Sequence, residues 1–284
     1  MLLFILNLHS HGQSRYEKYN QLITQANYYN WIEDDHVKAS QHYKKAFQIH
    51  TRFSSDIIEA LHSFNQLHDS AYSLFLISKA MENGIEMDWF KRSFVSKTKG
   101  FEKLAKNQNS YRLHHLKELN EFPEEVLNSI QQMIGIDQFI RNNNDSLNPV
   151  AWKKRLHYVD SSHIHQLMTL SKEYKCLLPG SFVLILHGTD ENPDAYNYFD
   201  SLMTSSIKQG LLHPAEYALF VDRHMRNINK KKAFLQEKPE QDPSQTYSLE
   251  ELRIIDTNRK KIGLMDLNNW FKVCCNEFTI PDLK

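Results

Sequence analysis

The chain has few of the residues that mark disulfide-rich, zinc-binding or turn-rich proteins. It contains three cysteines in 284 residues, and none of them stands in a C-x-x-C pair, which argues against a structural zinc site. Glycine and proline number eight each, few for the many tight turns of a β-sandwich. These scarcities favour a helical fold before any periodicity is considered.

An excess of charge of either sign is also lacking. Lysine plus arginine number 34 and aspartate plus glutamate number 34, so the formal net charge is zero. Domains that bind nucleic acid usually carry a basic excess or stripe, and the short runs 153–155 and 230–232 are more typical of solvated helix ends. We therefore expect no nucleic-acid partner. With 284 residues, of which 41% are hydrophobic, the chain is long enough for a sizeable core and for two domains.

Long apolar segments are scarce. A short one, Met1–Leu6, begins the sequence and is followed by Ser10 and Gly12, small residues at the positions that a signal peptidase reads. This pattern predicts an export signal over residues 1–12 and a periplasmic or secreted bacterial protein. A buried N-terminal segment is the alternative, because the basic region of a signal peptide is missing. No other stretch is long and apolar enough to cross a bilayer, so we expect no membrane span in the mature chain.

Motifs of well-known catalytic sites are missing as well. The sequence has no G-x-S-x-G, no H-E-x-x-H and no glycine loop of the kind that binds phosphate. His163 and His165 lie two residues apart in a helical pattern, so they face different sides and make a poor metal-binding pair. We therefore predict neither a metal site nor a cofactor.

What the sequence does contain is an internal helical repeat over residues 15–110. A shift of 34 residues, the tetratricopeptide period, superposes similar residues in pairs. The pairs are Ile23 on Ile57, Ala26 on Ala60, and Lys45-Ala46 on Lys79-Ala80. Apolar periodicity predicts four amphipathic helices, over residues 16–30, 36–49, 54–65 and 68–83.

This region resembles tetratricopeptide repeats, with a degenerate third helical segment from Asp88 to Leu104 that would cap the array. The resemblance implies an array of helical hairpins with a concave surface for a peptide or protein partner. The alternative is a plain pair of helical hairpins whose register coincides by chance. Weaker periodicity between Asn107 and Phe122 marks the expected junction with a second part, residues 120–284.

The second part also reads as helical. Pro123 begins a helix on which Asp137 and Arg141, four residues apart, share one face. We expect Asp160 to begin the next helix. The apolar run 182–187 has no second strand of similar quality to pair with, so we predict a buried helix that ends in His187.

Two further helices are expected in this part, over residues 193–209 and 213–228. Pro193 and Pro214 stand at their first turns, and the second helix carries Asp222 and Arg223 near its end. The predicted fold class is therefore all-α, with tetratricopeptide-like hairpins followed by a compact helical domain.

The order of these landmarks resembles a bacterial family of no known activity, domain of unknown function 6624, over about residues 125–268. The matching features are Asp137-Gln138-x-x-Arg141, the helix begun by Asp160, the apolar run ending in His187, the helix ending in Asp222-Arg223, and Asp256-x-x-Arg259-x-x-Ile262-Gly263-Leu264. The sequence departs from the family at His163, where asparagine is usual. It also departs at 241–247, which replaces a Tyr-Gly-Thr-Gln stretch.

Any chemistry would have to involve charged residues at the ends of apolar helices, because such groups are partly buried and need partners. The candidates are His187, Asp137, Arg141, Asp222 and Arg223. They form either interhelical ion pairs or a site in which His187 is a general base, oriented by Asp137 or Asp222, while an arginine holds an anionic substrate. We expect a protein-binding module, and a hydrolase-type enzyme is the alternative.

Overall fold

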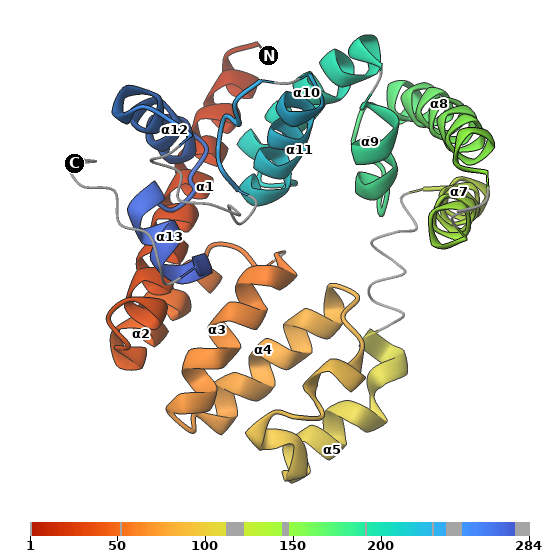
Figure 1. Cartoon of the computed structure of the whole chain (residues 1–284). Helices are drawn as coiled ribbons and strands as arrows, with labels where there is room; N and C mark the ends of the chain where they lie inside the picture. Colours follow the sequence, from red (N-terminus) through yellow and green to blue (C-terminus); the bar gives the residue numbers. More distant parts are fainter. Residues whose placement is uncertain are drawn as a thin grey trace. The chain divides into compact units, whose positions relative to one another are not determined.

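The computed structural model describes residues 2–51, 53–111, 122–143, 148–190, 192–228, 230–236 and 246–275, with side chains from Tyr16 to Cys274. Within these ranges the chain forms helices and turns and no β-strand, which confirms the all-α class (Figure 1). None of the helices in this part of the chain combines the length and the apolar character that a transmembrane segment requires. Most of the expected junction, residues 112–121, lies outside the described residues.

Contacts between residues divide the chain into two units, and the first of them is discontinuous. It comprises the described residues of Met1–Glu118, Lys208–Pro214 and Lys238–Lys284, and the second those of Leu119–Ile207 and Ala215–Glu237. The sequence analysis expected two consecutive parts, 15–110 and 120–284. Contacts group the described C-terminal helices with the first unit, and the last of these helices contacts the first helix of the chain.

The first unit begins with two helical hairpins. Helices α1 (Leu2–Trp31) and α2 (His36–Phe47) pair with each other, as do α3 (Ser54–Gln66) and α4 (Ser70–Glu82). The second hairpin contacts the first through both α1 and α2. Asp35 and Asp69 begin α2 and α4, since each carboxylate accepts a hydrogen bond from the backbone N–H three residues later. They correspond to the four helices that periodicity predicted for the repeat region, except that α1 begins at Leu2 and not near Tyr16.

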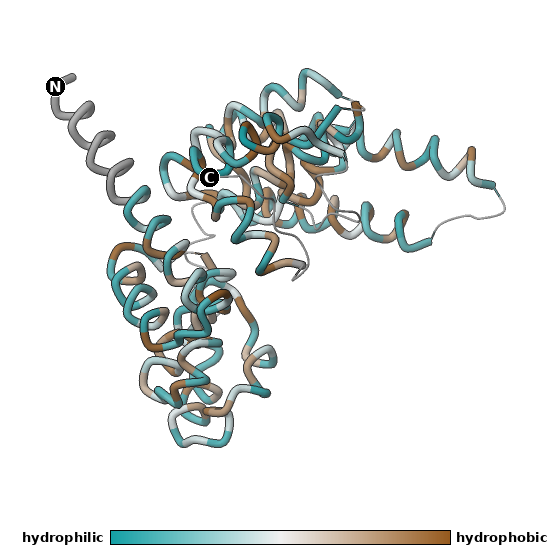
Figure 2. Tube along the Cα trace, turned by 60° about the vertical axis from the view of Figure 1, so that its left-hand side comes forward, coloured by the Kyte–Doolittle hydropathy of each residue, from teal (hydrophilic) through white to brown (hydrophobic). Residues whose placement is uncertain are grey.

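Helical spacing of apolar residues explains the packing of these hairpins. On α1, Tyr19, Ile23 and Ala26 are buried, and Figure 2 shows apolar and polar residues alternating around the helices. Residues 2–12, where the export signal is expected, form the first turns of α1. Their side chains lie outside the described part of the chain, and export stays a prediction.

The rest of the first unit packs around these hairpins. The 3-10 helices η1 (Met87–Phe90) and η2 (Phe94–Lys97) and helix α5 (Lys99–Lys106) contact α4. Helices α12 (Leu249–Lys261) and α13 (Leu267–Cys275) form a corner, and α13 contacts α1. Gly263 turns this corner at a φ of +84°, where a Cβ atom would lie 2.6 Å from Asn20 Nδ2 of α1. A side chain at this position would collide with that of Asn20 and strain the backbone at this φ, so glycine suits the corner.

The second unit contains α7 (Glu124–Asn142), α8 (Pro149–Tyr174), α9 (Phe182–Gly188), α10 (Pro193–Lys208) and α11 (Pro214–Asn227). Helices α7 and α8 pair, and α9 contacts both of them (Figure 1). Tyr196 of α10 stacks on Phe220 of α11 with ring centroids 4.9 Å apart. The predicted helix over 182–187 is confirmed as α9.

One predicted boundary in this unit is wrong. Helix α8 begins at Pro149 and not at Asp160, which lies near its middle. The Asn148 side chain accepts a hydrogen bond of 3.1 Å from Ala151 N, and proline follows at the first helical position. Both features are standard helix starts. The polar residues 153–155 hid the helical pattern, because their side chains are exposed.

Candidate functional site

The site begins on α7, where Asp137 and Arg141 share a face because they lie one helical turn apart. Arg141 Nε donates to Asp137 Oδ1 over 2.9 Å. The Asp137 side chain is completely buried, whereas Arg141 remains partly exposed. The neighbouring Gln138 Nε2 donates to the second carboxylate oxygen of Asp137 over 2.8 Å. A buried carboxylate is therefore held by donors from its own helix.

Helix α9 brings His187 to this carboxylate. His187 Nδ1 lies 3.0 Å from Oδ1 and 3.1 Å from Oδ2 of Asp137, fifty residues away in the sequence. The approach depends on Gly188, since a Cβ atom there would lie 2.5 Å from Ile164 Cβ and 3.1 Å from the carbonyl oxygen of Asp160. The missing side chain of Gly188 thus lets α9 pack closely on α8 and presents His187 to α7.

Helix α8 contributes Asp160, which the sequence analysis did not count among the candidates. Arg141 Nη2 donates to Asp160 Oδ1 over 2.7 Å, so one guanidinium bridges two carboxylates from two helices. The sequence analysis treated Asp160 as an expected helix start and as a landmark of the family resemblance, and the resemblance was the signal that could have found it. We call Asp137, Arg141, Asp160 and His187 the four-residue cluster.

The two carboxylates of the cluster differ in acidity. Burial alone would raise the pKa of Asp137, but hydrogen bonds from His187 and Arg141 outweigh burial and hold that pKa below its usual value. Burial raises the pKa of Asp160, and Arg141 only partly opposes the rise. Asp137 is therefore the carboxylate that stays ionised, and it fixes the orientation of His187.

This arrangement determines which nitrogen of His187 carries the proton. An ionised carboxylate only accepts hydrogen bonds, so the Nδ1 that faces Asp137 is the donor. The neutral ring then has its lone pair on Nε2, to which no described residue is hydrogen-bonded. A histidine oriented in this way by a carboxylate is suited to accept a proton from a bound molecule.

His163 lies on α8, near the cluster. Its side chain is buried, and its Nδ1 atom has no hydrogen-bond partner among the described residues. Burial lowers the pKa of His163, although the charges of Asp137 and Asp160 oppose this. The ring is therefore neutral near pH 7. Among the described residues, no three histidine, cysteine or acidic side chains are arranged to hold a metal ion.

The other two candidates serve different contacts in the second unit. The fully buried Asp222 accepts hydrogen bonds of 2.7–2.9 Å from the backbone N–H groups of Ala233, Phe234 and Gln236. Burial raises the pKa of Asp222, and these amides oppose the rise. Arg223 forms a bidentate pair with Asp190, at 3.0 and 2.8 Å. Asp222 thus anchors a backbone segment and Arg223 joins α11 to the end of α9.

The last motif of the family resemblance has a structural role in the first unit. Asp256 Oδ1 accepts from the backbone N–H of Leu267 over 2.7 Å, at the start of α13. Arg259 is buried, donates from Nε to the carbonyl oxygen of Met265 over 2.7 Å, and lies 5.2 Å from the centre of the Trp270 ring. With Gly263, these residues form the corner between α12 and α13.

Comparison with known proteins adds no relative to this picture. No family model, no curated protein and no solved structure matches the chain.

Proposed function

We propose that this chain is a protein-binding module whose first unit carries a tetratricopeptide-like array of helical hairpins. The supporting observation is that the apolar residues paired by the shift of 34 are buried in both copies, whereas the paired lysines, Lys45 and Lys79, are not. Ile23 and Ile57 are buried, as are Ala26 and Ala60, and Ala46 and Ala80. Alanine at matching positions lets two helices approach closely, as stacked repeats require.

The surface that we propose for the partner lies on α1 and α3, the first helices of the two hairpins. Trp31 stacks on His62 with ring centroids 4.6 Å apart, and its Nε1 donates to Glu59 Oε2 over 2.8 Å. Trp31 nevertheless remains 41% exposed, and Ile58, four residues before His62 on α3, is 37% exposed. Tryptophan side chains that are held in place and still accessible often supply much of the binding energy at interfaces.

Replacing Trp31 by alanine is expected to weaken partner binding at least tenfold, because the aromatic surface and its stacking on His62 are lost. The measurement starts from a random library of peptides displayed against the full chain. The affinities of selected peptides are then compared between the natural protein and the variant. Trp89→Ala is the matched control, since Trp89 is also exposed but lies on η1. Peptides that bind both variants equally well, or a library that yields no binder, would contradict the proposal.

A second candidate function is a hydrolase-type reaction at the four-residue cluster. The observation that favours it is the orientation of His187 by Asp137, which leaves Nε2 free to accept a proton. Arg141, partly exposed beside it, can bind an anionic group of a substrate. The helical arrangement around His187 includes no residue that we assign as a nucleophile, so water would be the attacking group.

If this second function operates, His187→Gln is expected to lower turnover at least a hundredfold, because a general base is removed. The purified protein is assayed against generic esters, phosphates and amides. His165→Gln is the control, since His165 is exposed on α8. Activity that survives unchanged in His187→Gln would assign the reaction to another site or to a contaminant.

A further inference from the structure

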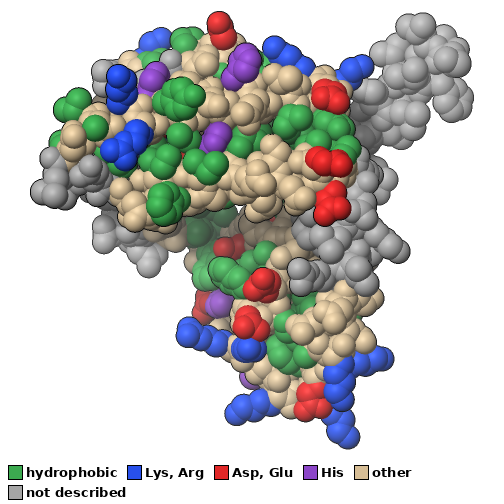
Figure 3. All heavy atoms as spheres, turned by 90° about the vertical axis from the view of Figure 1, so that its right-hand side faces the viewer, with side chains coloured by type: hydrophobic (Ala, Val, Ile, Leu, Met, Phe, Trp, Pro, Cys, Tyr) green, Lys and Arg blue, Asp and Glu red, His purple; other side chains and the backbone are tan. Residues whose placement is uncertain are grey.

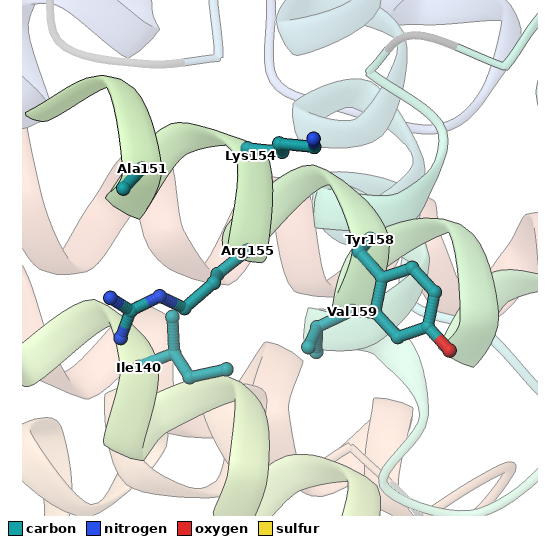
Figure 4. Close-up of a pocket in the computed structure, with 6 residues that line it drawn as sticks. All are labelled: Ile140, Ala151, Lys154, Arg155, Tyr158 and Val159. Atoms are coloured by element: carbon teal, nitrogen blue, oxygen red, sulfur yellow. The ribbon is translucent and has the colours of Figure 1, made fainter.

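Two hollows lie next to each other on the hairpin of α7 and α8. The larger has a volume of about 480 Å³ and is lined by Ile140, Ala151, Lys154, Arg155, Tyr158 and Val159 (Figure 4). The smaller, of about 330 Å³, shares Tyr158 and Val159 with it and extends to Met133 and His163. Because they share two residues, we treat them as one depression, the α7/α8 groove.

The groove has the length and the spacing of a helix-binding site. On α8 its lining residues recur every three or four positions from Ala151 to Gln166. At about 1.5 Å per residue this stripe is about 22 Å long, or four helical turns. Open grooves between two paired helices accept a third helix, which inserts residues at i, i+3, i+4 and i+7.

Large apolar side chains are exposed along this hairpin. Tyr158 and Ile136 line the groove and are 74% and 48% exposed, and Phe139 and Val150, on the same two helices, are 68% and 78% exposed. Figure 3 shows the side of the molecule on which α7 and α8 lie in Figure 1, with hydrophobic side chains gathered beside lysine and arginine. Apolar surface that is continuous over several turns, and not scattered, marks an interaction site.

Charge identifies the kind of helix that fits. Lys154 and Arg155 line one end of the groove, and neither is ion-paired with another described residue. No described acidic residue lines either hollow, and the smaller hollow is lined by uncharged polar residues such as Gln132 and Ser162. A partner with carboxylates against Lys154 and Arg155 would satisfy the unpaired cations.

We propose that the α7/α8 groove binds an amphipathic helix of a partner protein, with the acidic residues of that helix against Lys154 and Arg155. The apolar face of the helix packs on Ile136, Tyr158 and Val159. This surface belongs to the second unit and is independent of the proposed hairpin array, which lies in the first.

The test uses displayed peptides of about 18 residues, long enough to fill the groove, with leucine fixed at i, i+3, i+4 and i+7 and all other positions randomised. The full chain is expected to select peptides rich in aspartate and glutamate toward one end. The double substitution Lys154→Glu and Arg155→Glu is expected to lower the affinity of the chain for these peptides at least tenfold. Both residues are exposed, so folding is preserved. Lys153→Glu, exposed but outside the groove lining, is the control and should change affinity less than twofold.

Exchanging the acidic residues of a selected peptide for lysine should restore its binding to the double variant. Trp31→Ala should leave this binding unchanged, which separates the groove from the hairpin array. The proposal would be overturned if no peptide were selected or if the selected peptides bound the double variant equally well. It would also be overturned if the double substitution abolished self-association of the chain in sedimentation, or if it abolished binding to anionic phospholipid vesicles without weakening peptide binding. The last two would assign the groove to a second copy of the chain or to a membrane surface.

Discussion

Asp137→Ala is expected to lower the free energy of unfolding of the second unit by about 3–5 kcal/mol, because it removes the buried carboxylate that pairs with both Arg141 and His187. The difference in free energy of unfolding between the natural protein and the variant should become smaller as the pH is lowered. The pKa of Asp137 is depressed in the folded protein, so its stabilising contribution is present above about pH 4 and disappears as the pH falls through the folded pKa. Urea unfolding at several pH values measures both effects.

Hydrogen exchange of peptides from α7, α8 and α9 would assign the lost stability to the second unit. Asp190→Ala provides a matched control, since Asp190 also pairs with an arginine, but its side chain is 28% exposed. The bidentate Arg223–Asp190 pair should contribute less than the Asp137 interactions, because solvent partly screens the Asp190 carboxylate. Equal losses for Asp137→Ala and Asp190→Ala would show that burial of Asp137 does not strengthen its interactions.

Arg259→Ala is expected to destabilise the first unit by about 3 kcal/mol or more, because it opens a cavity and leaves the carbonyl oxygen of Met265 without its donor. The corner between α12 and α13 should loosen with it. Faster hydrogen exchange in α13 and a changed fluorescence of Trp270, on which the guanidinium lies, would report this loosening.

Arg253→Ala is the control for this experiment. Arg253 lies on the same helix as Arg259, but its side chain is half exposed. A surface substitution of this kind changes stability by about 0.5 kcal/mol at most. If Arg259→Ala were equally mild, the motif from Asp256 to Leu264 would have no structural role in the corner.

The helices were the most predictable part of this protein. The ends of α2, α3, α4, α10 and α11 lie within two residues of the predicted ones. The starts of all of these but α3 are marked by Asp35, Asp69, Pro193 and Pro214, residues that act locally on the backbone. The start of α8 was missed because the exposed residues 153–155 conceal the apolar period, although Asn148 and Pro149 stand there as a regular start signal.

The candidate site was only partly predictable. The pairing of Asp137 with Arg141 follows from their spacing of four on one helix. Asp222 and Arg223 were grouped with them because all are charged residues near apolar helix ends. In the structure Asp222 and Arg223 instead contact Ala233 and Asp190 and take no part in the four-residue cluster. Local sequence rules could not predict this, because these partners lie on segments whose positions depend on the tertiary fold.

The sequence by itself determined that the chain is helical and where most helices begin, because capping residues and apolar periodicity act over a few neighbouring residues. Only the tertiary structure decided that His187 contacts Asp137 and that Arg141 binds both Asp137 and Asp160. The grouping of α12 and α13 with the first unit was likewise decided by tertiary packing. These contacts link residues far apart in the chain. They depend on close approaches such as those at Gly188 and Gly263, which are set by the packing of whole helices.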